Sequence, residues 1–417
     1  MKKLFYIGIF LSLSNLLIAQ IYDFSDHPNE NESFTIADFR LYVPENTDTI
    51  RGIYIYMNGF GGDSRSIVQD STMRALVEDI NFSLMGVRLD NMHMDSGVGN
   101  SLLDYEYKVN DNILAELKLE KGCMSLSGYE EYFARHNSIK NLRPPEKISP
   151  GGSVANSIYS MAQFGDKVCF SGRVSNDDTG NNFIECLIDS GVHTFVGKSD
   201  EHKSGECLVL ITPDHERTMN TFLGSSEYLS ISDINLESLK NSEYLLIEGY
   251  LVTSKMNMEV CQFSLEQAIK ENIKTIITLS DPSVVDIFRD NFLYLLKNKI
   301  DILFCNEQEA KNFSQTDSID EALGYLKNFA NNFVVTLGKN GSVCFDGTEA
   351  NKIPTKEVQT KDFTGAGDMF LAAFMHSHCR GNNFINATKF ANHCAGKIIQ
   401  IYGAKFNNKR DYITLIN

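Results

Sequence analysis

The chain has 417 residues, 42% of them hydrophobic and 22% charged, and a formal net charge of −16. This length exceeds one average domain and allows a sizeable buried core, so we expect a large α/β domain plus an additional segment. The acidic balance argues against nucleic acid as a partner, because phosphate backbones are bound mainly by Lys and Arg.

The first 20 residues have the form of a secretory signal peptide. Lys2 and Lys3 precede a largely apolar run at positions 4–19, and the small residue Ala19 stands before polar sequence. A basic start, a short apolar stretch and a small residue are typical of such peptides. No later segment is apolar enough to cross a bilayer, so we expect no membrane contact for the rest of the chain.

Residues 21–91 predict an incomplete α/β unit. Strand-like runs at 39–43 and 52–57 are followed by a glycine-rich turn at 58–63 and a helix-like stretch at 66–80. This order resembles the opening of a secreted α/β-hydrolase, although ordinary turn chemistry also explains the glycines. The chain contains no G-x-S-x-G sequence, which such a hydrolase needs to present its nucleophile. We therefore interpret this segment as a truncated hydrolase-like fragment of unrelated origin, with a secreted hydrolase-like or binding protein as the outside alternative.

The cysteines indicate a different compartment for the rest of the chain. All nine lie after residue 120, their number is odd, and no two of them form a C-x-x-C pair. Scattered cysteines of this kind are typical of free thiols in a reducing compartment. We therefore expect a cytoplasmic C-terminal part, in conflict with the signal-like N-terminus.

The strongest chemical motif is D-F-T-G-A-G-D-M-F at positions 362–370. Gly365, Ala366 and Gly367 form a turn of small residues ahead of an apolar helical stretch, so their backbone N–H groups can bind an anion at a helix N-terminus. Asp368 is placed to accept a proton from an attacking hydroxyl group. A tight turn with a helix-capping aspartate is the simpler alternative.

Three further motifs precede it. P-G-G-S-V-A-N spans positions 150–156, N-E-Q-E spans 306–309, and V-V-T-L-G-K-N-G spans 334–341. Strand-like runs at 244–247, 275–278, 302–304 and 333–336 alternate with helical stretches, which predicts a parallel sheet. Together with the turn before Asp368, these motifs resemble the ribokinase/PfkB carbohydrate-kinase family. The segment G-V-G-N-S-L-L-D at 97–104 is similar to the adenosine-kinase-like branch of that family.

The resemblance covers residues 92–417 and implies their fold and activity. The implied fold is a ribokinase-like three-layer sandwich with a mainly parallel central sheet and a small β lid from parts of 95–125 and 195–225. ATP and Mg²⁺ are the implied cofactors, and a small-molecule sugar or nucleoside is the implied partner. The expected activity is phosphorylation of a hydroxymethyl group, with adenosine to AMP first and ribose or another sugar as the alternative. The oligomeric state stays open.

The resemblance also assigns roles to single residues. Those implied in sugar binding are Asp104, Gly151, Gly152 and Asn156. Those implied at the nucleotide are Thr336, Gly338, Gly341 and, as a phosphate clamp, Arg217. Asn306 and Glu309 stand three apart and share one face of a helical turn, and they are implied in holding Mg²⁺. Surface positions for Asp104 and Arg217, and a solvated polar face for Asn306 and Glu309, are the alternatives.

Overall fold

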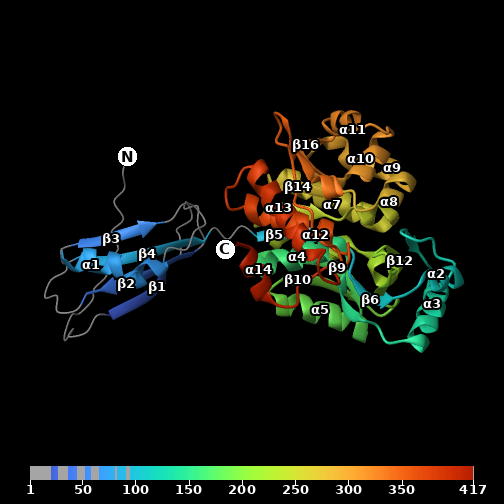
Figure 1. Ribbon diagram of the computed structural model, residues 1–417, viewed down its shortest axis with the longest axis horizontal. Coiled ribbons are helices and arrows are strands. Elements are labelled where there is room, and N and C mark those ends of the chain that lie inside the picture. The colour runs from blue at the N-terminus through green and yellow to red at the C-terminus, as the bar shows by residue number, and fades with distance from the viewer. Residues whose placement is uncertain are drawn as a thin grey trace. The chain divides into compact units, whose positions relative to one another are not determined.

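The computed structural model describes residues 20–26, 36–44, 52–57, 65–79, 82–90 and 94–416. The chain divides into two compact units, Met1–Met92 and His93–Asn417. Each unit has its own sheet, and each is considered separately below (Figure 1).

The larger unit is built on a sheet of nine strands, of which seven neighbours in the sheet are mutually parallel. The order is β10 (His193–Ser199), β9 (Val168–Ser175), β5 (Met94–Val98), β13 (Ser242–Ile247), β14 (Lys274–Thr278), β15 (Ile300–Asn306), β16 (Ala330–Thr336), β17 (Ser342–Phe345) and β18 (Ala350–Ile353). Only β17 and β18 join in antiparallel pairs, at one edge. The four strand-like runs expected from the sequence are the centres of β13 to β16.

Helices cover both faces of this sheet because neighbouring residues of its strands point to opposite sides. Leu246 and Ile276 belong to one buried cluster, while their neighbours Leu245 and Ile277 belong to another. The first cluster is completed by α4 (Ser153–Phe164), α5 (Asp178–Ser190), α12 (Ala366–His378), α13 (Phe384–Ile398) and α14 (Lys409–Ile416). The second is completed by α6 (Leu236–Lys240), α7 (Lys255–Lys270), α8 (Pro282–Ile287), α9 (Arg289–Leu295), α10 (Glu307–Ser314) and α11 (Ile319–Leu326). The three-layer α/β fold expected from the sequence is therefore confirmed.

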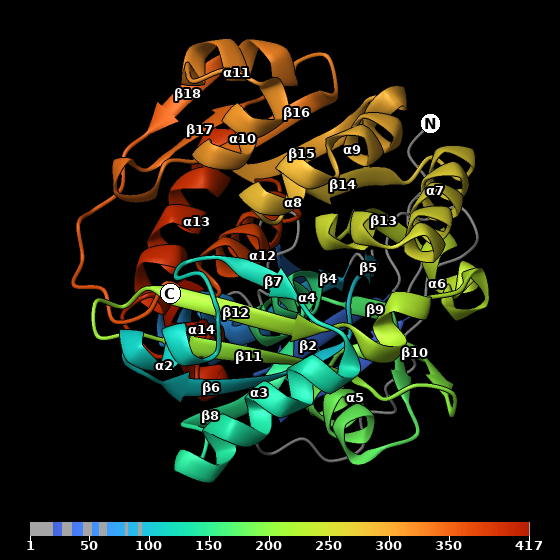
Figure 2. The same ribbon diagram turned by 90° about the vertical axis from the view of Figure 1, so that its right-hand side faces the viewer.

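A second sheet of five strands, here called the lid, has two different faces. Its order is β7 (Met124–Leu126), β12 (Arg217–Phe222), β11 (Gly205–Ile211), β6 (Leu102–Lys108) and β8 (Lys147–Gly151). Leu208 and Leu210 of β11 pack in one cluster with α2 (Asp111–Glu116) and α3 (Tyr129–Leu142). The alternating residues Cys207 and Val209 lie on the other face, in a separate cluster. Figure 2 shows the lid strands with α2 and α3 beside them.

The lid differs in extent from the segments expected to form it. β6, β7, β11 and β12 come from those segments, but β5 and β10 belong to the central sheet. β8 and α3 add residues 129–151 to the lid. The lid therefore draws on three stretches of the chain rather than two.

The smaller unit has a four-stranded sheet in the order β1 (Gln20–Asp26), β2 (Ile36–Val43), β4 (Phe82–Asp90) and β3 (Gly52–Met57). The helix-like stretch expected at 66–80 is a 3-10 turn, η1 (Arg65–Gln69), followed by α1 (Ser71–Asp79). Tyr42, Val68 and Val77 form its small buried core. The signal-like residues 1–19 and the glycine-rich turn at 58–63 lie outside the described residues, so the signal peptide and the hydrolase-like fragment stay predictions.

Among the helices that the structure describes, none is both long and apolar enough to span a bilayer. All nine cysteines, which lie within the larger unit, are free thiols.

Candidate active site

A cavity of about 400 Å³ lies between the central sheet and the lid. Glu248, Thr278, Asn306 and Thr336 line it, and each stands at or just after the carboxyl end of a parallel strand. Open α/β sheets bind their ligands at this edge, where the loops after the strands converge. The cavity is therefore where the fold places its chemistry.

Asp368 lies in the first turn of α12 and faces this cavity. Its two carboxylate oxygens are held separately: Oδ1 accepts a hydrogen bond from Ser153 Oγ at 2.7 Å, and Oδ2 accepts one from Asn156 Nδ2 at 2.9 Å. Burial raises the pKa of this carboxyl, against the two hydrogen bonds that lower it. Asp368 does not cap α12 through its side chain, so the simpler capping interpretation is not what the structure shows.

The helix N-terminus beside Asp368 is made of bare backbone. Gly365 is the N-cap of α12 with φ +74°, a left-handed conformation that glycine adopts without strain. A side chain on Gly367 would meet no atom of the protein within 4 Å, so its backbone is open toward the cavity that it lines. Because α12 has 13 residues, its aligned peptide dipoles favour negative charge at this turn.

Asp104 of β6 faces the same cavity from the lid side. Burial raises its pKa to about 6, while Lys405 and Arg217 act in the opposite direction. Its carboxylate lies directly on Gly151, where an added Cβ would be 1.9 Å from Asp104 Oδ1. Gly151 itself does not line the cavity, so its role is to leave room for this carboxylate.

Gly152 and Asn156 do line the cavity. Gly152 has φ +93°, and an added Cβ would be 2.2 Å from the carbonyl oxygen of Asn100, so no other residue fits there. Asn156 donates its side-chain amide to Asp368, which connects the predicted sugar-binding residues to the predicted base. The G-G-x-x-x-N motif therefore serves both carboxylates.

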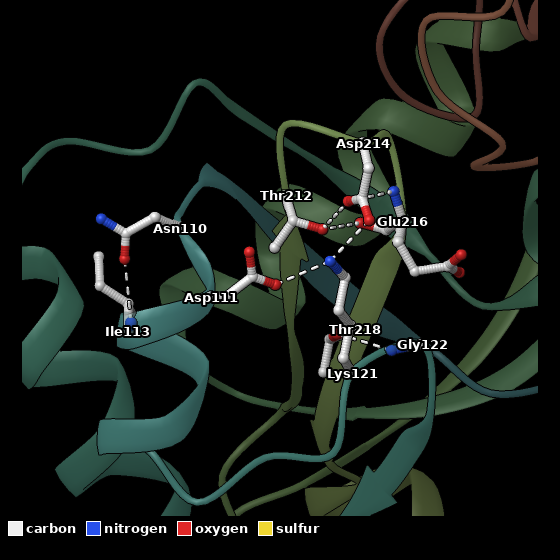
Figure 3. A network of polar contacts seen from close by, with 9 residues as sticks. All are labelled: Asn110, Asp111, Ile113, Lys121, Gly122, Thr212, Asp214, Glu216 and Thr218. Carbon is white, nitrogen blue, oxygen red and sulfur yellow. Dashed lines mark hydrogen bonds and ion pairs between the residues drawn. The ribbon is translucent and has the colours of Figure 1, made fainter.

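Arg217 begins β12 and lines the cavity from the lid. Figure 3 shows how the preceding turn is fixed: Lys121 Nζ donates to Asp111 Oδ1 at 2.7 Å and to Asp214 Oδ2 at 2.6 Å. Within the described ranges, no hydrogen bond or ion pair engages the Arg217 guanidinium itself. A charged fork held at the wall of a cavity is suited to binding phosphate.

The predicted nucleotide residues separate into two groups. Thr336 and Gly338 line the cavity at the end of β16. Gly341 does not, because it forms the turn into β17 with φ +86°, where an added Cβ would be 2.1 Å from the carbonyl oxygen of Ile353. Gly341 therefore has a local backbone role in this hairpin.

Asn306 and Glu309 line the cavity but are bonded to each other. They form the capping box of α10: Glu309 N–H donates to Asn306 Oδ1 at 2.8 Å, and Asn306 N–H donates to Glu309 Oε2 at 3.0 Å. Burial raises the pKa of Glu309 to about 8, which favours its neutral form. Neither residue is free to act as a direct ligand, so this pair fits Mg²⁺ only through water, in the manner common for that ion. The described residues contain no group of three or more His, Cys, Asp or Glu able to hold a metal.

Sequence reasoning missed Glu248, which follows β13 and is 1% exposed. Its carboxylate accepts hydrogen bonds from Asn100 Nδ2 at 2.7 Å and from Val154 N–H at 3.0 Å. Burial raises its pKa to about 7. Asn100 stands inside the recognised segment 97–104, but Glu248 stands alone in the sequence and carries no motif.

Lys405 was also missed. Its side chain is 5% exposed, and its Nζ donates to the carbonyl oxygen of Pro150. It lies 5.0 Å from the ring centroid of Tyr159 and acts electrostatically on Asp104 and Asp368. A buried lysine near the C-terminus of a chain gives no recognisable sequence signal.

A parallel α/β sheet, a β lid, an anion-binding helix N-terminus and a carboxylate in its first turn define an enzyme that transfers phosphoryl groups to a small hydroxyl-bearing substrate. The description "pfkB family carbohydrate kinase" matches residues 123–410. The chain belongs to this family and is a sugar or nucleoside kinase. The family implies ATP as the phosphoryl donor.

Known proteins similar to the chain include both nucleoside and sugar kinases. It is 23% identical to adenosine kinase of Saccharomyces cerevisiae over 75% of the chain and 96% of that protein. It is 27% identical to ribokinase of Mus musculus over 54% of the chain and 70% of that protein. The crystal structure of adenosine kinase from Sinorhizobium meliloti superposes with a TM-score of 0.73 at 28% identity, covering 78% of the chain and 98% of that structure. A probable sugar kinase from Rhizobium etli gives 0.72 at 28% identity, covering 78% and 99%.

Proposed function

We propose that the larger unit transfers the γ-phosphoryl group of ATP to the hydroxymethyl group of adenosine and so produces AMP and ADP. The observation that carries this proposal is the position of Asp368. Both of its carboxylate oxygens are fixed by side chains, and it stands beside the bare turn of α12 in a cavity that Asp104 shares.

In the proposed reaction Asp368 takes the proton from the attacking hydroxyl group as its oxygen forms a bond to the γ-phosphorus. The bond between that phosphorus and the β–γ bridging oxygen breaks, and ADP leaves with the electron pair. The backbone N–H groups of Gly365–Gly367 and the guanidinium of Arg217 stabilise charge on the transferred group. Mg²⁺ bound to the ATP phosphates would supply further neutralisation, and Glu309 is the residue that we propose to hold its water ligands.

The lid supports a nucleoside rather than a bare sugar as the acceptor. Its cavity-facing side chains are mostly apolar: Leu102, Met124, Leu126, Val209, Met219 and Leu223. Ribose offers hydroxyl groups on all sides, whereas a purine base offers a flat apolar face that such a wall can cover. Asp104 offers only acceptor atoms when ionised, which suits the hydroxyl groups of the attached ribose.

Asp368→Asn in the full chain tests the catalytic part of this proposal. The change keeps the size of the side chain but removes its basicity, so we expect the turnover rate to fall about 10²–10⁴-fold with little change in ATP binding. ADP formation and binding of an ATP analogue are the two measurements. Asp178→Asn is the matched control, because Asp178 is an exposed residue in the first turn of α5 and does not line the cavity. Near-normal turnover by Asp368→Asn would contradict the assigned role.

The acceptor is tested with a panel of adenosine, other nucleosides, ribose, fructose and fructose phosphates. We expect kcat/KM for adenosine to exceed that for the others. A clear preference for ribose or another sugar would keep the mechanism and replace the acceptor, and no turnover of any compound would refute the proposed function.

A further inference from the structure

Three consecutive residues between α13 and α14 contact both sides of the cavity. On the phosphoryl side, Gly403 N–H donates to Asp362 Oδ2 at 2.8 Å. A Cβ added to Gly365 would lie 2.5 Å from the Cα of Ala404, so these two backbones are in direct contact. Residues 403–404 therefore support the turn that begins α12.

Lys405 continues this segment toward the acceptor side. Its Nζ donates to the carbonyl oxygen of Pro150, at the end of lid strand β8. The next residue along β8 is Gly151, on which the Asp104 carboxylate lies. The segment also receives a bond from the lid, since Lys147 Nζ donates to the Lys405 carbonyl oxygen at 3.4 Å.

A buried ammonium group is unfavourable unless polar partners or charges compensate it. The contacts of Lys405 Nζ among the described residues are one carbonyl oxygen and the Tyr159 ring, at 5.0 Å from the ring centroid. Burial lowers its pKa to about 8, and Cys186, Asp104 and Asp368 act in the opposite direction. Its compensation therefore includes the two carboxylates that face the cavity.

We infer that Lys405 is a positioning residue that holds the acceptor-binding carboxylate of Asp104 in register with the phosphoryl-binding turn of α12. It does so through Pro150 on one side and through its neighbours Gly403 and Ala404 on the other. This inference rests on the proposed function for the meaning of the register, but the physical connection is independent of the acceptor's identity.

Hydrogen exchange of Lys405→Met in the full chain tests the connection directly. Methionine keeps most of the side-chain volume and removes the charge and the donor. We expect faster exchange of backbone amides in both 149–153 and 362–367. Arg173→Met is the matched control, because it removes a partly buried cation paired with Asp233 at 2.8 Å that does not line the cavity. It should leave both segments protected.

Kinetics with whichever acceptor the wild type uses provide a measurement that a merely structural lysine would not affect. The groups that act on Asp104 are Lys405, Arg217 of β12, Asp368 of α12 and Lys147 of β8. Removing the charge of Lys405 favours protonation of Asp104, so the acid limb of kcat/KM for the acceptor should move to higher pH. The acceptor KM should rise at least ten-fold while the KM for ATP changes less than two-fold, and Lys405→Arg should restore the limb.

The inference is supported if exchange increases in both segments and the acid limb moves. It is overturned if either segment keeps its protection, or if the acid limb of Lys405→Met coincides with that of the wild type. Absence of turnover by the wild type would refute the proposed function alone, and the exchange measurement would then decide whether Lys405 connects the two sides.

Discussion

Asp104 and Asp368 face the same cavity but have different surroundings. Asp368 receives two side-chain hydrogen bonds, which fix its orientation. Asp104 receives no hydrogen bond from any other described side chain, and its oxygens are oriented by the bare backbone of Gly151. A carboxylate with open lone pairs is available to a ligand, whereas one that is already oriented can receive a single proton. This contrast supports acceptor binding for the first and base catalysis for the second.

Asp104→Asn should weaken binding of the acceptor and remove its dependence on acidic pH. Burial raises the pKa of Asp104 to about 6, so the wild-type carboxylate is lost as pH falls through that value. We therefore expect the wild-type acceptor KM to rise steadily below about pH 6. In Asp104→Asn the KM should be high at every pH and flat across pH 5–8. Steady-state kinetics at saturating ATP measure both, and a persistent acid limb in the variant would assign it to another group.

The residues that could be predicted from the sequence are those that stand together in short motifs. Asp368 and the turn before it occupy four consecutive positions, so their chemistry is visible without a fold. Glu248 and Lys405 could not be predicted in this way, because each is isolated in the sequence and meets its partners only across the folded chain. The assignment of Asn306 and Glu309 had the opposite problem: their spacing of three equally describes the capping box that the structure shows.

At the level of elements, the central strands were predictable and part of the lid was not. β13 to β16 are apolar runs between helices, which is the usual pattern of a buried parallel strand. β8 has the sequence K-I-S-P-G, and its proline and glycine disguise it as a turn. It can form because it is the edge strand of the lid, where a missing N–H on the outer side breaks no ladder.

The start of α12 should tolerate no side chain at Gly365. Its φ of +74° disfavours any other residue, and a Cβ would clash with Ala404. We expect Gly365→Ala to lower the free energy of unfolding by about 1–3 kcal/mol and to weaken ATP binding, because the turn must shift. Chemical denaturation and a nucleotide-binding assay measure the two effects.

Gly396→Ala in α13 provides the comparison for that prediction. A Cβ at Gly396 would meet no atom within 4 Å, and the residue lies inside a regular helix. This substitution should therefore stabilise the protein by about 0.5–1 kcal/mol and leave nucleotide binding unchanged. Equal effects of the two substitutions would show that the conformation at Gly365 is not specially constrained.

Across the larger unit as a whole, three buried glutamates stand where the sheet, lid and helices meet: Glu106, Glu248 and Glu309. They are 1–4% exposed. Burial raises the pKa to about 7 for Glu106 and Glu248 and to about 8 for Glu309. A carboxyl group with a raised pKa keeps its proton longer in the folded protein than in the unfolded chain. The contribution of each group is thus fully present below its ordinary pKa of 4.5 and is lost as pH rises through the folded value.

The larger unit should therefore lose stability as pH rises from 5.5 to 8.5. For Glu248 alone, a shift from 4.5 to about 7 corresponds to about 3 kcal/mol. His378 and His393, whose pKa values burial lowers, act in the opposite direction near neutrality. Carboxyl groups with lowered pKa values, such as Asp214, act only at more acidic pH. The chain has no tryptophan, so far-UV circular dichroism during urea unfolding is the suitable measurement.

Glu248→Gln separates this mechanism from a general effect of net charge. The variant cannot titrate at this position, so its free energy of unfolding should fall less between pH 5.5 and 8.5, by up to about 3 kcal/mol. Its stability at any single pH can differ from that of the wild type, because glutamine cannot accept both hydrogen bonds; only the slope decides. Glu130→Gln changes the formal charge equally at an exposed position of α3 and should keep the wild-type slope. If Glu248→Gln also keeps that slope, the buried carboxyl groups do not set the pH dependence, and repulsion within the acidic chain, with its net charge of −16, becomes the explanation.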